Sequence, residues 1–272
     1  MGELKKRRLG RTDLLVSELG LGAMDTPHSP EAMPTIETAL DLGIDFIDTA
    51  REYEGSEFLL GKVIRHRGGE GFHIASKTFR RSASGAQYDI DRSLKVLGLP
   101  KLPLYQLHDV STPEAWDEVR NEDGALEGLK TAQYRGLIDH IGVSSHNLEL
   151  LPELITSGEF STVMIEYSAF HPQTAPLIEL AANHDVGVIV MRPVGGSGRT
   201  TTMRGNIAHG TAGILTPANL LRYVLSNPAV SVAIPGASYP SRIIENVATA
   251  TESQLMTEAE KRALEAAAAE LY

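Results

Sequence analysis

The sequence contains no cysteine in 272 residues. This absence excludes disulfides, catalytic thiolates, cysteine-ligated zinc and iron–sulfur clusters. A chain of this length does not depend on such cross-links, because it can bury roughly three quarters of its unfolded surface. The nine histidines form no H-E-x-x-H motif or other metal-ligand spacing, so we expect no metal site.

Positive charge is also in short supply. The chain has 25 Lys and Arg residues against 35 Asp and Glu residues, which gives a formal net charge of -10. Such a surface repels nucleic acids and anionic lipids, so neither is expected as a partner. An anionic cofactor is still compatible with this charge, since a local arginine or a helix N-terminus can bind it.

Long apolar runs are missing as well. No stretch approaches the length of a membrane span, and the basic segment 1–10 lacks the apolar core of a secretory signal. The composition, with 42% hydrophobic and 22% charged residues, is that of an ordinary globular protein. We therefore expect a cytoplasmic monomer built as one domain over residues 1–272.

The chain does contain a repeated alternation of short apolar runs and amphipathic stretches. Two runs around the turn cluster 10–13 predict an N-terminal β-hairpin, and eight strand–helix units follow. The expected strands are 19–22, 44–48, 72–76, 104–107, 140–143, 162–167, 186–191 and 230–234, and the expected helices are 30–42, 56–64, 88–97, 125–134, 148–156, 175–183, 217–225 and 241–250. The closing stretch 257–271 starts with a Thr257/Glu260 capping box and predicts an extra C-terminal helix.

Eight such units suggest either a doubly wound sheet or a closed barrel. A nucleotide-binding doubly wound sheet carries G-x-G-x-x-G after its first strand, but segment 20–25 reads G-L-G-A-M-D and lacks the third glycine. The α/β pattern therefore favours a (β/α)8 TIM barrel, in which functional groups gather where the strands end.

Four ionisable residues fall at the ends of three successive expected strands: Asp48, Tyr53, Lys77 and His108. Reduction of a carbonyl requires a hydride on carbon and a proton on oxygen. A tyrosine titrates at about pH 10, and an adjacent lysine ammonium is expected to lower that pKa and make the phenol a better acid. The aspartate would hold the lysine in place, and the histidine would donate a hydrogen bond to the substrate oxygen.

Each of the four residues also has an ordinary structural interpretation when it is taken alone. Asp48 is compatible with a helix cap or a buried ion pair, Tyr53 with a loop aromatic and Lys77 with a solvated cation. His108, beside Asp109, is compatible with a structural histidine. The catalytic hypothesis depends on their coincidence at successive strand ends.

The residues around these four resemble a known family. Segment 45–57 resembles the aldo-keto reductase motif that contains the catalytic Asp and Tyr, 75–77 is similar to the family's lysine strand, and 105–108 to its histidine strand. The resemblance covers nearly the whole chain. It implies a barrel, a nicotinamide cofactor bound without a Rossmann domain, and a small carbonyl compound as substrate. The catalytic residues that it implies are Asp48, Tyr53, Lys77 and His108.

The resemblance also implies a cofactor site. Segment 234–246 is similar to the family's adenosine-phosphate segment, and Arg242, Glu245 and Asn246 share one helix face. Arg242, near a helix N-terminus, is placed to hold a 2′-phosphate, whereas the alternative is a surface salt bridge with Glu245. Many relatives carry Lys-Ser where this chain has Gly-Ala at 236–237, so NADP(H) is expected and NAD(H) is the alternative.

The nicotinamide end departs further from the family pattern. Segment 141–147 resembles the motif that binds the carboxamide, but a serine replaces the usual Asn and a methionine the usual Gln, while an arginine replaces a stacking tyrosine. Segment 195–198 offers glycine backbone for a pyrophosphate, or is simply a mobile surface loop. The expected cofactor-binding residues are Gly22, Ser144, Ser145, Met164, Arg192, Gly195, Ser197, Gly236, Ser238, Arg242, Glu245 and Asn246.

Segment 191–193 resembles a bacterial branch of the family, in which some relatives append a cysteine-rich iron–sulfur tail that is not expected here. The long C-terminal loop that often walls the substrate pocket is essentially missing, so we expect an open pocket, and the substrate and the reaction direction are not encoded in any recognisable motif. Trp116 falls in the expected loop after His108, where a loop anchor is preferred over a substrate contact.

Two other functions stay open at this point. A weakly catalytic, cofactor-sensing module similar to potassium-channel β-subunits would share the same four residues. A Schiff-base aldolase would use Lys77 as its nucleophile. An aspartate five residues before a tyrosine has no place in that second mechanism, so carbonyl reduction is preferred.

Overall fold

Eight parallel strands form the centre of the protein in a computed structural model, which describes residues 2–210 and 213–270 and leaves aside the side chain of Ser197. Each strand pairs in parallel with the next one along the chain, so the sheet order is the sequence order. The strands are β3 (Leu21–Gly22), β4 (Phe46–Asp48), β5 (His73–Thr78), β6 (Leu102–Leu107), β7 (Ile138–Ser144), β8 (Thr162–Glu166), β9 (Gly187–Met191) and β10 (Val232–Ile234). The predicted (β/α)8 barrel is confirmed.

The barrel closes between its first and last strands. Bridges join Leu19 to Ala233 and Gly22 to Gly236, and the amide of Gly20 donates to the carbonyl of Ala233 at 2.8 Å. A Cβ on Gly22 would lie 2.9 Å from the carbonyl oxygen of Ile234, closer than real Cβ contacts come. The glycine at this position is therefore what lets the two strand ends approach.

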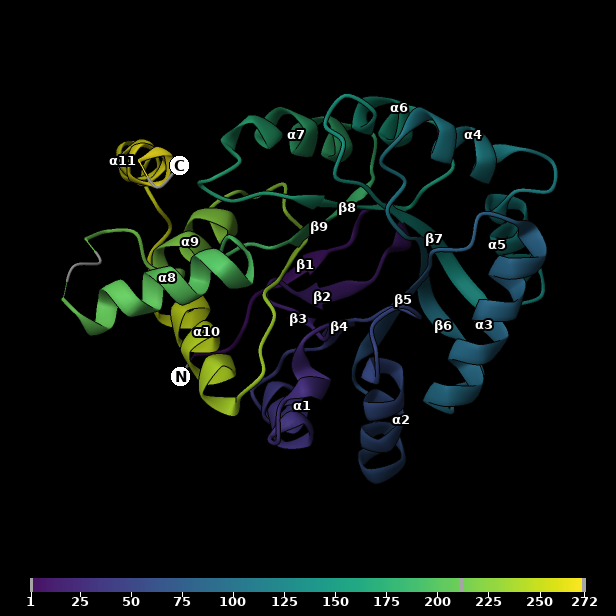
Figure 1. Ribbon diagram of the computed structural model, residues 1–272, viewed down its shortest axis with the longest axis horizontal. Helices are drawn as coiled ribbons and strands as arrows, with labels where there is room; N and C mark the ends of the chain where they lie inside the picture. Colours follow the sequence, from purple (N-terminus) through teal and green to yellow (C-terminus); the bar gives the residue numbers. More distant parts are fainter. Residues whose placement is uncertain (1, 211–212, 271–272) are drawn as a thin grey trace.

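Helices surround the strands as a ring (Figure 1). They are α1 (Ala32–Asp41), α2 (Ser56–Arg67), α3 (Ala83–Leu97), α4 (Pro113–Arg120), α5 (Ala125–Tyr134), α6 (Leu151–Thr156), α7 (Ala175–Asn183), α8 (Gly196–Ala208), α9 (Pro217–Leu225), α10 (Pro240–Glu252) and α11 (Glu258–Ala269), with 3-10 turns η1 (Gly10–Thr12), η2 (Thr26–His28) and η3 (Pro172–Thr174). The expected helices are all present, with α3 beginning earlier because Ser82 caps it.

Two helices, α4 and α8, occupy segments that were expected to be loops. Helix α4 begins after Thr112, whose side chain accepts a hydrogen bond from the amide of Ala115, and Pro113 occupies its first turn. Helix α8 includes the glycine-rich segment, so the backbone after Gly195 is the first turn of a helix and not an irregular loop.

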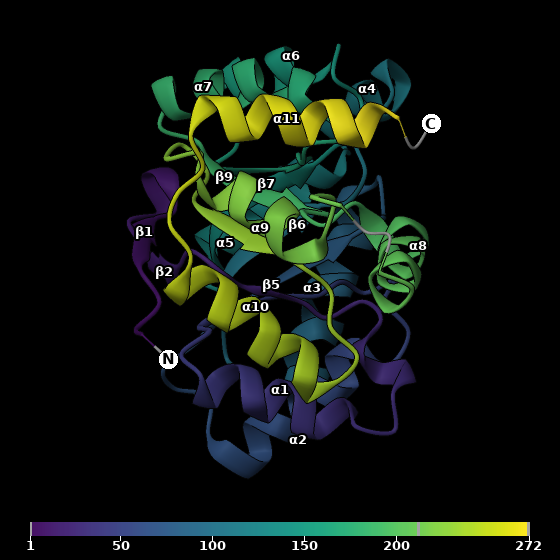
Figure 2. The same cartoon turned by 90° about the vertical axis from the view of Figure 1, so that its left-hand side faces the viewer.

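The N-terminal hairpin covers one end of the barrel. Its strands β1 (Lys6–Arg8) and β2 (Leu15–Ser17) are antiparallel, as expected. Leu9 and Val16 are fully buried and belong to the cluster inside the barrel, together with Phe46, Leu104 and Ile189. Figure 2 shows the hairpin and helix α8 at opposite ends of the barrel. The hairpin therefore leaves uncovered the end of the barrel at which the parallel strands finish, and a ligand can enter there.

The extra C-terminal helix α11 is also present. Thr257 and Glu260 form the predicted capping box, with each side chain bonded to the other residue's backbone amide. The helix packs on α9, where the Tyr223 hydroxyl donates to Glu265 at 2.6 Å. Within residues 2–210 and 213–270, no helix is both long and apolar enough to cross a membrane.

Candidate active site

Lys77, on β5, lies at the centre of the four predicted catalytic residues. Its side chain is fully buried, and its Nζ donates to Asp48 Oδ2 at 2.7 Å, to the carbonyl oxygen of Thr49 at 2.8 Å and to the Tyr53 hydroxyl at 3.2 Å. The same nitrogen lies 4.4 Å from the centre of the Tyr53 ring. Three groups from β4 and the segment after it thus share one ammonium.

The segment between β4 and α2 places Tyr53 by attaching itself to β5. The amide of Thr49 donates to the carbonyl of Ala75 at 2.8 Å, and the amide of Arg51 donates to that of Lys77 at 3.1 Å. The Arg51 guanidinium pairs with Glu57, a buried carboxylate that also accepts a hydrogen bond from the Ser76 hydroxyl at 2.6 Å. These contacts hold the backbone on both sides of the tyrosine.

Burial and pairing compete for the pKa values of these groups. Burial raises the pKa of the Asp48 carboxyl, and the adjacent Lys77 ammonium opposes that rise. Burial lowers the pKa of Lys77, but Asp48 and Tyr53 together outweigh it, so the lysine stays an ammonium. The expected fall in the pKa of Tyr53 is not the net result: burial raises this pKa above its usual value of 10.0, and Lys77 only limits the rise.

His108, which follows β6, meets the tyrosine edge-on. The two ring centres are 5.5 Å apart and the planes are at 85°. His108 Nδ1 lies 3.1 Å from a carboxylate oxygen of Glu52. The Arg81 guanidinium donates to the carbonyl oxygens of His108 and Asp109 at 3.0 and 2.8 Å, which fixes the backbone at this strand end.

A cavity of about 840 Å³ opens beside these residues and runs along the mouth of the barrel. Asp48, Tyr53 and His108 line one part of it. The structure also brings most of the expected cofactor residues to its wall. They are Gly22, Ser144, Met164, Arg192, Gly195, Gly236, Ser238, Arg242 and Asn246.

Two of the other expected cofactor residues, Ser145 and Glu245, are not among those that line the cavity. Ser145 is fully buried, and its hydroxyl accepts a hydrogen bond from the amide of Asn147 at 3.2 Å. Glu245 accepts two hydrogen bonds of 2.8 Å from Arg242. The side chain of Ser197 lies outside the described part of the structure.

Several lining residues were not predicted. Two of them, Arg199 and Arg204, are on α8, and Nε of Arg204 is buried without a hydrogen-bond partner in the described residues. A helix assigned to this segment would have placed Arg199 close to its N-terminus, where anions bind, whereas Arg204 lies more than one turn further along the helix. The other unpredicted side chains that face the cavity include Met24, Asp25, His146, Thr200, Thr201 and Tyr239.

Arg192, expected near the nicotinamide, is held by an ion pair. Its φ is 51°, and its guanidinium lies 3.4 Å from Glu166 at the end of β8. His171 and His146 lie 3.3 and 3.7 Å from the same carboxylate. The Glu166 carboxylate therefore compensates the arginine charge on this side of the cavity.

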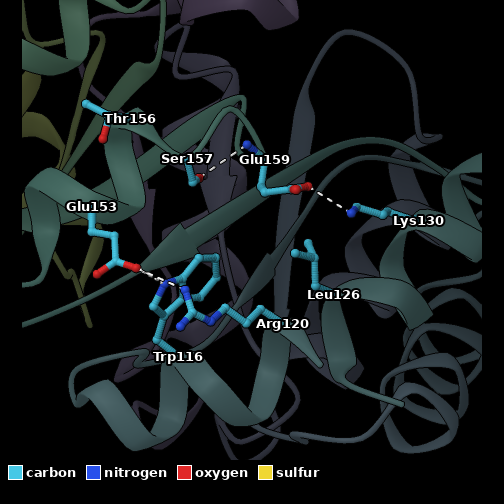
Figure 3. Close-up of a pocket in the computed structure, with 8 residues that line it drawn as sticks. All are labelled: Trp116, Arg120, Leu126, Lys130, Glu153, Thr156, Ser157 and Glu159. Carbon is cyan, nitrogen blue, oxygen red and sulfur yellow. Dashed lines mark hydrogen bonds and ion pairs between the residues drawn. The ribbon is translucent and has the colours of Figure 1, made fainter. Parts of the chain in front are cut away.

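Trp116 belongs to a different place in the fold. It lies on α4, where its indole Nε1 donates to Glu153 of α6 at 2.6 Å and its ring packs 5.8 Å from that of Phe160. It lines a separate cavity of about 400 Å³ with Arg120, Lys130 and Glu153 (Figure 3). Trp116 thus joins α4 to α6 and has the role of a structural anchor. It lies on a helix and not in the expected loop.

The groups gathered at the barrel mouth are a phenol, an ammonium, a carboxylate and an imidazole. Within the described ranges, no group of three or more His, Asp or Glu side chains could hold a metal ion. A tyrosine hydroxyl supported by a buried lysine–aspartate pair, beside a long cavity with arginines, is typical of the (β/α)8-barrel oxidoreductases. A model of the "Aldo/keto reductase family" matches residues 18–267, and the chain belongs to this family.

Individual relatives agree with this family. The chain is 26% identical to the uncharacterized oxidoreductase YqkF of Bacillus subtilis, over 96% of each chain. An aldo-keto reductase from Bacillus halodurans in its holo form is 25% identical, with a TM-score of 0.78 over 97% of this chain and 96% of that one. An aldo-keto reductase from Klebsiella pneumoniae in complex with NADPH is 20% identical, with a TM-score of 0.76 over 97% and 95% of the two chains.

Proposed function

We propose that this protein reduces an aldehyde or ketone to an alcohol with NADP(H), and that Tyr53 donates the proton. The observation that carries this proposal is the position of Lys77 Nζ, which bonds to both Tyr53 and Asp48 at the edge of the large cavity. The small carbonyl substrate would lie between the Tyr53 hydroxyl and His108.

The residues have distinct parts in the reaction. When bound, the reduced nicotinamide supplies the hydride that the carbonyl carbon accepts. Tyr53 gives its hydroxyl proton to the carbonyl oxygen, and the phenolate that forms is stabilised by the Lys77 ammonium 3.2 Å away. The raised pKa keeps Tyr53 protonated at neutral pH but makes it a weaker acid, so proton donation depends on the stabilisation of the phenolate by Lys77. Asp48 keeps the lysine charged and oriented.

The cavity fits a dinucleotide in both shape and charge. Its glycine-lined wall at Gly22 and Gly236 lets a ligand approach the backbone closely. At one end, Arg242, Asn246 and Ser238 would hold the 2′-phosphate and the adenosine. The first turn of α8 would take the pyrophosphate, since helix N-termini favour anions and both Arg199 and Arg204 of this helix line the same cavity. Ser144 and Met164 would lie at the nicotinamide. The Klebsiella relative of the same fold binds NADPH.

The test is turnover of simple aldehydes, ketones and quinones with NADPH and with NADH. Tyr53→Phe is expected to lower kcat by ~10²–10⁴-fold, the range of general acid catalysis, while the affinity for NADPH stays within about twofold. Tyr134→Phe, which changes a tyrosine that is 94% exposed, is the matched control and should keep full activity. A Tyr53→Phe variant with most of the original kcat would overturn the proposal.

The two other functions predict different results in the same assay. Tight binding of NADPH without turnover of any carbonyl would indicate a cofactor sensor. Trapping of a keto compound on Lys77 by borohydride would indicate an aldolase. The position of Asp48 argues against the aldolase. An imine-forming lysine must become a neutral amine, and the Asp48 carboxylate 2.7 Å from Lys77 Nζ opposes this.

A further inference from the structure

Glu52 connects three segments at the mouth of the barrel. It precedes Tyr53 in the segment after β4. Its Oε1 accepts a hydrogen bond from the backbone amide of Phe79, after β5, at 2.9 Å. Its Oε2 lies 3.1 Å from Nδ1 of His108, after β6. Both carboxylate oxygens thus have partners, and one of these partners, His108, belongs to the four residues of the proposed active site.

His108 is enclosed on several sides. Its side chain is 17% exposed, and the rings of Tyr53 and Phe79 meet it edge-on with centres 5.5 and 5.6 Å away. The charged groups around it are Glu52, Asp48 and Lys77, together with Arg81, whose guanidinium bonds to the carbonyl oxygens of residues 108 and 109. With Nδ1 turned to Glu52, Nε2 is the ring nitrogen that can serve the cavity.

The Glu52 carboxyl is ionised at neutral pH. Partial burial raises its pKa, but the hydrogen bonds from His108 and from the Phe79 amide outweigh this effect and make the pKa lower than usual. An ionised carboxylate only accepts hydrogen bonds, so the proton in the contact must be on Nδ1 of His108. In a neutral imidazole with a proton on Nδ1, Nε2 carries a lone pair and accepts. Nε2 becomes a donor only when the ring is an imidazolium.

We propose that Glu52 is a positioning residue, which holds a proton on Nδ1 of His108 and so sets the direction of the hydrogen bond at Nε2. The imidazolium donates to the oxygen of a substrate carbonyl, and the neutral ring accepts from the hydroxyl of a product alcohol. This role presupposes the proposed carbonyl reduction. No proton leaves His108 during the reaction, because Tyr53 supplies it. Reduction is then favoured at lower pH and alcohol oxidation at higher pH.

The first test is the pH profile of kcat/KM in both directions, from about pH 5 to 9, around the usual range of histidine. Glu52→Gln keeps the size of the side chain and removes its charge. The fall of reduction with rising pH should move about one pH unit lower, which is about tenfold less activity at pH values above the wild-type midpoint. Alcohol oxidation at high pH should change little. Glu54→Gln removes the same charge from an exposed neighbour and should leave both profiles unchanged.

Rescue separates positioning from mere structural support. Glu52→Asp keeps the carboxylate and should return the profile towards that of the wild type. A uniform loss of kcat/KM at every pH in Glu52→Gln, or superimposable wild-type and Glu52→Gln profiles, would overturn the proposed role.

A second measurement does not need turnover. In protein labelled with ¹⁵N-histidine, the signals of His108 are those missing from His108→Asn. The wild type should show the proton of the neutral ring on Nδ1, and Glu52→Gln should show a smaller share of that tautomer. A proton on Nε2 of the neutral wild-type ring would overturn the role of Glu52. If the wild type reduces no carbonyl, the proposed function fails, while this spectrum still decides where the proton of His108 lies.

Discussion

The Lys77 ammonium nitrogen lies 2.7 Å from Asp48 Oδ2, and the two side chains are 0% and 3% exposed. Water therefore has almost no access to the two charges, and each depends on the other for compensation. Thr49 and Tyr53 supply further bonds to the lysine, and Gln106 donates to the aspartate at 3.3 Å. Removal of only one partner of such a pair lowers the stability of the fold strongly, since the remaining charge is buried without compensation.

We predict that Lys77→Met lowers the free energy of unfolding by about 3–5 kcal/mol, because it leaves the Asp48 carboxylate uncompensated in the interior. The double variant Asp48→Asn/Lys77→Met should recover a large part of that loss while staying inactive. Urea unfolding followed by circular dichroism measures both. Lys95→Met, at an exposed position of α3, is the control and should change little. A Lys77→Met variant as stable as the wild type would contradict the mutual dependence of the two charges.

Arg242 should distinguish the two nicotinamide cofactors. It lines the cavity and is tied to Glu245 by two bonds of 2.8 Å. Arg242→Ala is expected to weaken NADPH binding by about tenfold or more, as loss of a charge-assisted hydrogen bond does, and to leave NADH nearly unaffected. Glu245→Gln frees the guanidinium and should tighten NADPH binding. Fluorescence titration gives the Kd values, and an equal loss for both cofactors would remove the 2′-phosphate assignment.

Alkaline pH should destabilise the protein through two buried tyrosines. Burial raises the pKa of Tyr105 and of Tyr223 above the usual value of 10.0. The folded state then keeps protons that the unfolded chain releases. This contribution to stability is fully present below about pH 10 and is lost above it, at about 1.4 kcal/mol per pH unit for each tyrosine.

Unfolding free energies at about pH 9 and 11, on either side of the tyrosine range, check this prediction. Tyr105→Phe should be less stable at the lower pH, because Ser93 loses a hydrogen-bond partner, but its stability should fall less steeply with pH. Tyr88→Phe, at an exposed position, should leave the slope unchanged. Equal slopes in Tyr105→Phe and the wild type would show that this tyrosine is not responsible.

Trp116 should matter for stability and not for catalysis. Its indole nitrogen bonds to Glu153 between α4 and α6, away from the cavity that Tyr53 lines. Trp116→Phe should keep kcat/KM for any substrate within about twofold and cost about 1 kcal/mol of stability, the usual value of one hydrogen bond. A selective change in KM for one carbonyl would instead place the residue in the substrate path.

The sequence predicts the barrel well because its strands are short apolar runs followed by polar groups. Runs such as 186–191 are apolar on both faces, as parallel strands that are covered on both sides are. Parallel strands all end at one edge, so the ends of β4, β5 and β6 bring Asp48, Lys77 and His108 together without further information.

Helix α8 and the electrostatics of the site were beyond local sequence patterns. The α8 segment contains three glycines and three threonines, residues of low helix propensity, and shows no apolar periodicity. The pKa of Tyr53 was expected to fall because its charged neighbour is visible in the sequence, whereas the burial that raises it depends on the whole fold. Nor does the sequence pattern show that the Ser145 hydroxyl is buried and accepts a hydrogen bond from the backbone amide of Asn147.

The contact that closes the barrel also forms part of the wall of the large cavity. Gly22 and Gly236 bridge the first and last strands of the ring, and both also belong to the cavity wall. A molecule seated there touches two pieces of chain that are separated by most of the polypeptide. A ligand that binds only while these two strands are joined would stabilise the junction, and loosening the junction would weaken its binding by the same free energy.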